Sequence, residues 1–230
     1  MNAYFIFGLG FFAQMLFSTR TIVQWFKSEK EGEVISPVID WQISLFASIL
    51  MLVYGILRND FSIILGQAIV YIIYIRNLQL KNAWKKMFLL SRILAVVIPL
   101  GVLVWLIFSN SYNFSTILKN EDVSTLLLIW GTAGQLIFTF RFIYQWIYSE
   151  TRKDSFLPLG FWIISLVGSL MIFVYSIYRL DPVLFVSHSL GLFVYFRNIL
   201  LHYGKESLFS KLAGVPLLNK IINKVSDKIK

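Results

Sequence analysis

A repeat of one unit runs through this chain and limits the folds that the chain can adopt. Residues 17–29 read FSTRTIVQWFKSE and residues 138–150 read FTFRFIYQWIYSE, so that Arg141 stands 121 positions after Arg20. The same offset relates Gln145 to Gln24 and holds without a gap for about seventy residues. The chain is therefore a duplication, and its fold must accommodate each feature of the unit twice.

Composition places both copies in a membrane. The chain has 230 residues, of which 57% are hydrophobic and 14% charged, whereas a soluble domain carries about 25% charged residues. Several apolar runs approach the roughly 20 residues that an α-helix needs to cross a bilayer. We predict an all-α polytopic membrane protein whose seven transmembrane helices occupy residues 3–26, 38–57, 61–78, 87–108, 124–147, 159–178 and 182–201.

The number of spans predicts how the two copies are arranged. Each copy has three spans, an odd number, and the unrepeated span 87–108 restores the orientation of the second copy. This predicts two parallel three-helix repeats related by a pseudo-two-fold axis along the membrane normal, a 3+1+3 plan. The predicted divisions are a first repeat at 1–80, a linker helix and loop at 81–123, a second repeat at 124–202, and a basic amphipathic tail at 203–230 that lies on anionic lipid.

The distribution of basic residues predicts the orientation. Sixteen lysines and arginines fall after the first, third and fifth spans or in the tail, against three on the opposite face. The positive-inside rule then puts the N-terminus outside, in the periplasm, and the C-terminus in the cytoplasm. The net charge of +9 is accounted for by the membrane surface, and we expect no nucleic-acid partner.

The inventory of reactive side chains argues against catalysis. The chain has no cysteine and only two histidines, which are far apart in sequence, and no pair of carboxylates falls in the middle of a span. No set of residues has the spacing of a catalytic triad, a metal centre or a phosphate loop. We therefore expect a protein that is not an enzyme and that holds no cofactor and no metal.

Two arginines inside apolar spans are the leading candidates for a ligand site. A charged group in hydrocarbon costs about 2.5–3.5 kcal/mol, so Arg20 and Arg141 either extend toward the headgroups or face a cavity inside the protein. Glutamines share their helix faces, and amides beside a guanidinium suit phosphate oxygens or sugar hydroxyls. This favours an inward-facing anion site with four amides: Gln14, Gln24, Gln135 and Gln145.

A second group of polar residues closes the third span of each copy. It consists of Tyr74, Arg76, Asn77, Tyr195, Arg197 and Asn198. These residues either anchor the helices at the cytoplasmic interface or line the mouth of the cavity, where Glu29 and Glu150 could pair with the arginines. His188 is expected to be a hydrogen-bonded packing residue, and the tryptophans Trp25, Trp41, Trp146 and Trp162 to form an interfacial belt.

The repeated positions also carry a family resemblance. The second copy has Gly134-Gln135, Arg141-Phe142, Gln145-Trp146, Ser149-Glu150, Pro158, Phe161-Trp162, Asp181-Pro182 and Arg197-Asn198. In this pattern the chain resembles the lipid-A-disaccharide synthase N-terminal domain family, with Asp40 and Ser187-His188 as departures. The resemblance implies a three-span membrane module with a role around lipid A or other lipid-linked sugars in a Gram-negative inner membrane. More distantly, the plan is similar to SWEET and PQ-loop transporters.

These observations predict a non-enzymatic membrane protein that binds and translocates a lipid-linked sugar or glycolipid. The expected partners are membrane lipids, the sugar-bearing lipid and a glycosyltransferase. Two alternatives remain open: a membrane anchor or accessory subunit of a cytoplasmic glycosyltransferase, and a SWEET-like uniporter for free sugar. The resemblance does not imply synthase activity, because that activity belongs to a separate glycosyltransferase domain.

Overall fold

The computed structural model describes residues 3–57, 61–108, 124–180 and 182–208. Within these ranges the chain is all-helical, with a short 3₁₀ helix, η1, before α4. The elements are α1 (Ala3–Glu31), α2 (Val38–Leu57), α3 (Phe61–Leu80), η1 (Trp84–Lys86), α4 (Leu89–Phe108), α6 (Thr125–Arg152), α7 (Leu159–Arg179) and α8 (Pro182–His202). The predicted helices are present, and α1 and α6 each run about five residues beyond the predicted spans. Residues 209–230, most of the predicted amphipathic tail, lie outside the described residues.

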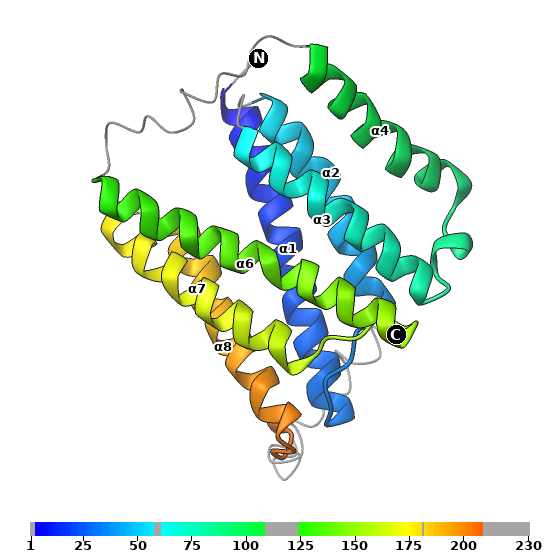
Figure 1. The fold of residues 1–230 in the computed structure, drawn as a ribbon, viewed down its shortest axis with the longest axis vertical. Coiled ribbons are helices and arrows are strands. Elements are labelled where there is room, and N and C mark those ends of the chain that lie inside the picture. The colour runs from blue at the N-terminus through cyan, green and yellow to red at the C-terminus, as the bar shows by residue number, and fades with distance from the viewer. Residues whose placement is uncertain (1–2, 58–60, 109–123, 181, 209–230) are drawn as a thin grey trace.

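Each repeat is a three-helix unit built around its middle helix. In the first repeat α2 packs against α1 and α3, and in the second α7 packs against α6 and α8 (Figure 1). A Cβ atom on Gly168 would lie 2.7 Å from the backbone nitrogen of Phe138. Only glycine therefore allows α7 to approach the backbone of α6 this closely.

The turn that follows the first helix of each repeat has the same construction in both copies. Its first residue adopts a left-handed conformation, with φ of 75° at Gly32 and 56° at Lys153. The hydroxyl of Ser28 then accepts a hydrogen bond from the backbone N–H of Ile35 at 3.1 Å. Ser149 accepts the equivalent bond from Phe156, also at 3.1 Å. The repeat in sequence is thus a repeat in backbone structure.

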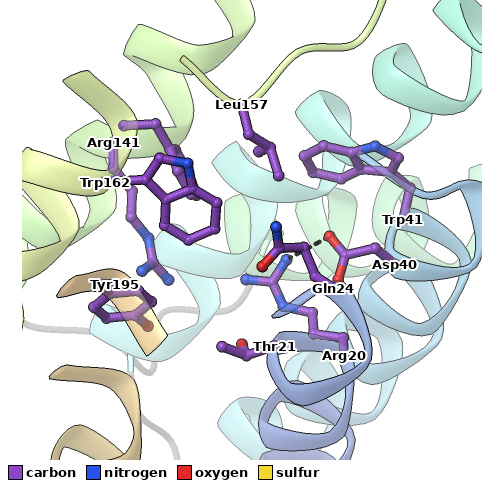
Figure 2. Close-up of a pocket in the computed structure, with 10 residues that line it drawn as sticks. Arg20, Thr21, Gln24, Asp40, Trp41, Arg141, Leu157, Trp162 and Tyr195 are labelled. Carbon is purple, nitrogen blue, oxygen red and sulfur yellow. Dashed lines mark ion pairs between the residues drawn. The ribbon is translucent and has the colours of Figure 1, made fainter. Parts of the chain in front are cut away.

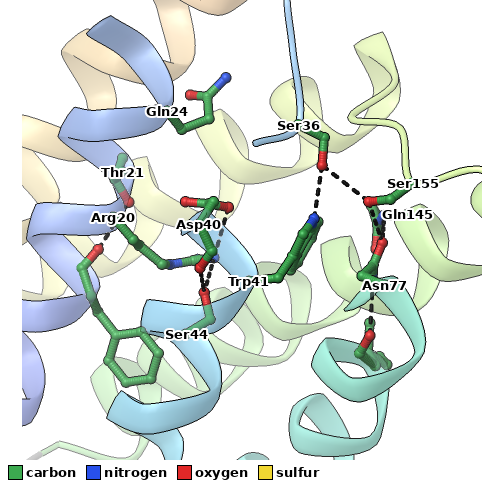
Figure 3. Close-up of polar contacts among 12 residues, drawn as sticks. Arg20, Thr21, Gln24, Ser36, Asp40, Trp41, Ser44, Asn77, Gln145 and Ser155 are labelled. Carbon is green, nitrogen blue, oxygen red and sulfur yellow. Dashed lines mark hydrogen bonds and ion pairs between the residues drawn. The ribbon is translucent and has the colours of Figure 1, made fainter. Parts of the chain in front are cut away.

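The two repeats meet through contacts that are exchanged between them. Gln24 of α1 hydrogen-bonds with Asn198 of α8. Gln145 of α6 hydrogen-bonds with Asn77 of α3, as Figure 3 shows. Gln145 is the repeat equivalent of Gln24, and Asn198 is the repeat equivalent of Asn77. The second pair is therefore the first pair with the two repeats interchanged. Such reciprocity is the signature of a two-fold interface, here a pseudo-two-fold because the two halves belong to one chain.

These contacts define one end of the molecule, which we call the polar end. It comprises the C-terminal ends of α1, α3, α6 and α8 with the connecting segments 32–37 and 153–158. The two segments meet there, because the hydroxyls of Ser36 and Ser155 are hydrogen-bonded at 3.0 Å (Figure 3).

Among the residues that the structure describes, four helices are long and apolar enough to cross a membrane, as expected of a multi-pass membrane protein. They are α1, α2, α7 and α8. Many of their large apolar side chains are exposed on the outside of the bundle, among them Phe46, Val167 and Phe193. An apolar exterior of this kind is stable in lipid. Helix α4 lies on the outside of the first repeat, where it contacts α2 (Figure 1).

Candidate functional site

A small cavity lies between the two repeats. Its lining includes both intramembrane arginines, Arg20 from α1 and Arg141 from α6, and Figure 2 shows their guanidinium groups pointing toward each other across it. The volume is about 20 Å³, which is room for one water molecule. The other lining residues are Thr21, Gln24, Asp40, Trp41, Leu157, Phe161, Trp162 and Tyr195.

Arg20 is held by polar partners from its own repeat. Its Nη1 lies 3.7 Å from Oδ2 of Asp40 and donates a hydrogen bond of 3.0 Å to the hydroxyl of Ser44. Asp40 and Ser44 are one turn apart on α2, since Ser44 in turn donates to the carbonyl of Asp40. The Arg20 residue is only 7% exposed, so it is a buried member of an ion pair.

Arg141 is surrounded by aromatic rings instead. Its Cζ lies 3.5 Å from the ring centroid of Phe138, 4.7 Å from that of Phe142, 5.5 Å from that of Phe161 and 5.4 Å from that of Tyr195. Among the residues that the structure describes, no carboxylate lies within 4.0 Å of its guanidinium. Cation–π contacts stabilise this buried charge without neutralising it.

Several buried polar atoms around the cavity have no hydrogen-bond partner within the described part of the chain. They are Nε of Arg20, Oδ1 of Asp40, Nε of Arg141 and Nε1 of Trp162. Buried polar groups are nearly always paired, and each unpaired one costs about 1–3 kcal/mol. A cluster of them around one cavity is therefore the arrangement expected of a binding site.

The two halves of the cavity differ chemically at positions that the repeat makes equivalent. Asp40 in the first repeat corresponds to Phe161 in the second, so Arg141 lacks the carboxylate that Arg20 has. Ser36, which accepts a hydrogen bond of 2.8 Å from Nε1 of Trp41, corresponds to Leu157. The indole N–H of Trp162 therefore has no hydroxyl acceptor at the position equivalent to Ser36.

The polar end closes the space beside the cavity with two ion pairs. Arg197 of α8 pairs with Glu29 of α1, and Arg76 of α3 pairs with Glu150 of α6. The two ion pairs are repeat equivalents of each other. Like the amide pairs, each ion pair therefore joins a residue of one repeat to a residue of the other. The sequence suggested that Glu29 and Glu150 pair with these arginines. The structure confirms this pairing, and each ion pair joins one repeat to the other.

The structure brings together only part of the predicted site. Arg20, Arg141, Gln24 and Tyr195 line the cavity, and Tyr74 packs with its ring centroid 5.8 Å from the Cζ of Arg20. The two arginines are buried and face inward. The remaining predicted residues are placed elsewhere: Gln145, Asn77 and Asn198 in the amide pairs, and Arg76 and Arg197 in the ion pairs of the polar end.

The outer glutamines of the predicted set differ from each other. Gln14 donates a hydrogen bond of 2.9 Å to the hydroxyl of Ser187 on α8, whereas Gln135 is exposed. The repeat explains the difference, because the position equivalent to Ser187 is Gly66, which offers no hydroxyl. Neither glutamine belongs to the cavity lining.

Two other sequence interpretations can be compared with the structure. His188 is a packing residue as predicted: its Nδ1 lies 2.9 Å from the hydroxyl of Ser169, and its ring packs against Phe138. The interfacial belt is wrong for Trp41 and Trp162, which are 0% and 2% exposed and line the cavity. They pack inward because each stands next to the cavity residue of its repeat, Asp40 or Phe161.

Sequence reasoning did not include Asp40 and Phe142 in the site. Phe142 contacts both arginines, with its ring centroid 5.2 Å from the Cζ of Arg20 and 4.7 Å from that of Arg141. A signal for Asp40 existed, since it is the deepest acid in the sequence and breaks the repeat pattern. Phe142 has no such signal, because a phenylalanine in an apolar helix is indistinguishable from a lipid-facing one.

Comparison with known families identifies the repeated unit. The family described as the Lipid A Biosynthesis N-terminal domain matches residues 9–79 and again residues 130–200. The chain belongs to this family. The two matches are offset by the 121 positions of the internal repeat, so the duplication is a tandem pair of family domains.

Individual relatives carry a matching region within longer chains. A lipid-A-disaccharide synthase of Chlamydia pneumoniae is 31% identical over 207 residues, which are 88% of this chain and 34% of the relative. That of Chlamydia felis is 29% identical over 212 residues, again 88% and 34%. This chain thus spans about a third of the length of these relatives, and their remaining two thirds have no counterpart in its residues. No solved structure matches the chain.

Proposed function

We propose that this protein is a non-enzymatic membrane protein that binds and translocates a lipid-linked sugar or glycolipid through the cavity between its repeats. One observation carries the proposal: a buried guanidinium from each repeat faces the same cavity, beside polar atoms that lack partners. Guanidinium groups recognise phosphate strongly, and aromatic rings and amides suit a sugar. The description of the family as a lipid A biosynthesis domain supports a sugar-bearing lipid as the class of ligand.

The proposal includes an arrangement in a bacterial inner membrane. All seven helices cross the bilayer as two parallel three-helix repeats with α4 as the linker helix, a SWEET-like plan. The reciprocal contacts between the repeats support this plan, because parallel repeats are related by an axis along the membrane normal. The polar end faces the cytoplasm and the N-terminus faces the periplasm, as expected from basic residues such as Lys27, Lys81 and Lys153.

A ligand of this class requires the repeats to move apart. A cavity of about 20 Å³ holds a water molecule but not a sugar ring. The lipid chain of a glycolipid can remain in the bilayer while only its polar group enters the protein. We therefore interpret the described conformation as a closed one, with the polar end sealed by the exchanged amide and ion pairs.

Lipid binding by the purified protein tests the proposal. The full chain in lipid nanodiscs would be mixed with farnesyl phosphate-glucose, a short lipid-linked sugar, and binding measured by native mass spectrometry. We expect the wild type to bind it, and the variant Arg20→Gln/Arg141→Gln to lose at least about tenfold in affinity, since charge-assisted hydrogen bonds to phosphate are lost.

The control variant is Arg152→Gln, which removes an exposed arginine from the same helix as Arg141 and should leave binding unchanged. Circular dichroism would show that each variant remains helical. Absence of binding by the wild type, or equal binding by the double variant, contradicts the proposal.

A second function, a membrane anchor for a glycosyltransferase, is favoured by the relatives. In the chlamydial synthases the matching region is part of a chain about three times as long, so the module can act beside an enzyme. An anchor predicts that residues 205–230 retain a cytoplasmic partner and that glutamine at both cavity arginines does not release it. Affinity purification from a native membrane distinguishes the two functions.

A further inference from the structure

The charges that line the cavity do not balance. Within the described part of the chain, the charged residues in its lining are Arg20, Asp40 and Arg141. The carboxylate of Asp40 forms an ion pair with Arg20 at 3.7 Å, and Phe161 occupies the equivalent place beside Arg141. The cavity therefore holds one surplus positive charge.

The surplus charge belongs to Arg141. This residue is only 5% exposed, and its guanidinium contacts rings rather than a carboxylate. A buried charge without a partner of opposite sign is strongly unfavourable, and natural proteins keep one chiefly where a ligand supplies the partner. Figure 2 shows this guanidinium directed into the cavity from the side opposite Arg20 and Asp40.

Two of the unpaired donors around the cavity lie in the same half as the surplus charge. Nε of Arg141 and Nε1 of Trp162 are both buried, and neither has an acceptor in the described ranges of the chain. A phosphate group offers oxygen acceptors to two such donors at once. The guanidinium of Arg20, by contrast, already has a carboxylate and a hydroxyl partner, because its Nη1 contacts Asp40 and Ser44, although its Nε has no partner among the described residues.

We propose that the ligand bound at Arg141 carries a single negative charge, as does a phosphodiester that joins a sugar to a lipid, and that the cavity discriminates against diphosphate-linked sugars. This inference rests on the proposed function and names the substrate class of the same site. One negative charge neutralises the cavity, whereas a diphosphate would bring a second negative charge without a partner into a low-dielectric space beside Asp40.

The test compares two lipids that differ by one phosphate group and therefore by one negative charge. Farnesyl phosphate-glucose has a phosphodiester with one negative charge, and farnesyl diphosphate-glucose carries two. Affinities of both would be measured by native mass spectrometry with the full chain in nanodiscs. For the wild type we expect at least about a tenfold preference for the phosphodiester, as electrostatic discrimination across a buried site allows.

Three variants change the cavity charge in defined steps. Asp40→Asn raises the surplus to two charges and should move the preference toward the diphosphate. Arg141→Gln removes the surplus and should weaken binding of both lipids. Phe161→Asp keeps both arginines but gives Arg141 its own carboxylate, and should also weaken both.

The matched control is the double variant Arg20→Gln/Asp40→Asn, which removes the ion pair without changing the surplus charge. It should bind both lipids more weakly, because Arg20 faces the cavity, but it should keep the wild-type preference between them. It also guards against a failure of Asp40→Asn to fold. If the wild type binds both lipids equally, or if the double control reverses the preference, the inference is overturned while the proposed function stands. If the wild type binds neither lipid, both fail.

Discussion

Asp40 and Phe161 occupy the same position of the repeat, and the difference between them sets the charge of the cavity. The arginines, the tryptophans and the serines at 44 and 165 are all kept in both copies. The exchange at this one position therefore gives the duplicated structure a site whose two halves differ in charge. The turn after the first helix of each copy differs in a similar way, with glycine in one copy and lysine in the other.

Replacing Lys153 with glycine is expected to stabilise the protein. Lys153 adopts a φ of 56°, and a left-handed conformation costs a residue with a side chain about 1–2 kcal/mol. Glycine is the equivalent residue of the first copy and adopts this conformation readily. Thermal unfolding in detergent should show a raised midpoint for Lys153→Gly and a lowered one for the converse change, Gly32→Ala. A lowered midpoint for Lys153→Gly would show that its side chain has a stabilising contact.

At the scale of helices, the two repeats are joined by contacts of α1 with α8 and of α6 with α3. Each connection consists of an amide pair and an ion pair at the polar end. The two ion pairs are equivalent in sequence but differ in environment. The side chains of Arg197 and Glu29 are 7% and 0% exposed, whereas those of Arg76 and Glu150 are 37% and 29% exposed.

The two ion pairs should therefore differ in their contribution to stability. Glu29 also accepts hydrogen bonds from Trp25 and from the backbone N–H of Leu208, so its loss leaves Arg197 as an unpaired buried charge. We expect Glu29→Gln to lower the free energy of unfolding by about 3–5 kcal/mol and Glu150→Gln by about 1 kcal/mol or less. Denaturant unfolding of both variants measures the difference, and equal losses would refute the argument from burial.

For the whole molecule, the closed polar end limits access to the cavity. The amide pairs, the ion pairs and the contact between Ser36 and Ser155 all cross from one repeat to the other on this side. A ligand much larger than water enters only if the repeats separate at some point of their interface. The proposal that the polar end faces the cytoplasm makes this the cytoplasmic gate.

A crosslink across the polar end tests this gate. The chain has no cysteine, so the double variant Asn77→Cys/Gln145→Cys can be joined selectively by a short thiol-reactive reagent. These positions lie outside the cavity lining, and joining α3 to α6 should slow the binding of farnesyl phosphate-glucose added on that side. Each single-cysteine variant is the control. Unchanged binding after complete crosslinking would mean that the ligand enters elsewhere.

The sequence predicted the helices and the inward arginines but not the partners of the polar residues. The spacing of Gln24 and Arg20 shows that they share a helix face, and burial of that face follows from the cost of a charge in lipid. Spacing within a helix does not specify which helix lies opposite. Gln24 and Gln145 were for that reason expected to bind a ligand, and their protein partners were not predicted. In the structure they bind Asn198 and Asn77, and Gln24 also lines the cavity.

The amino-acid sequence by itself determined the duplication, the apolar helices and the presence of two arginines that hydrocarbon does not tolerate, because each of these follows from local composition and period. Tertiary structure alone decided that both arginines share one cavity, that Asp40 neutralises only one of them, and that the repeats exchange partners at the polar end. These facts depend on distances between helices that are far apart in the chain, and local propensity carries no information about such distances.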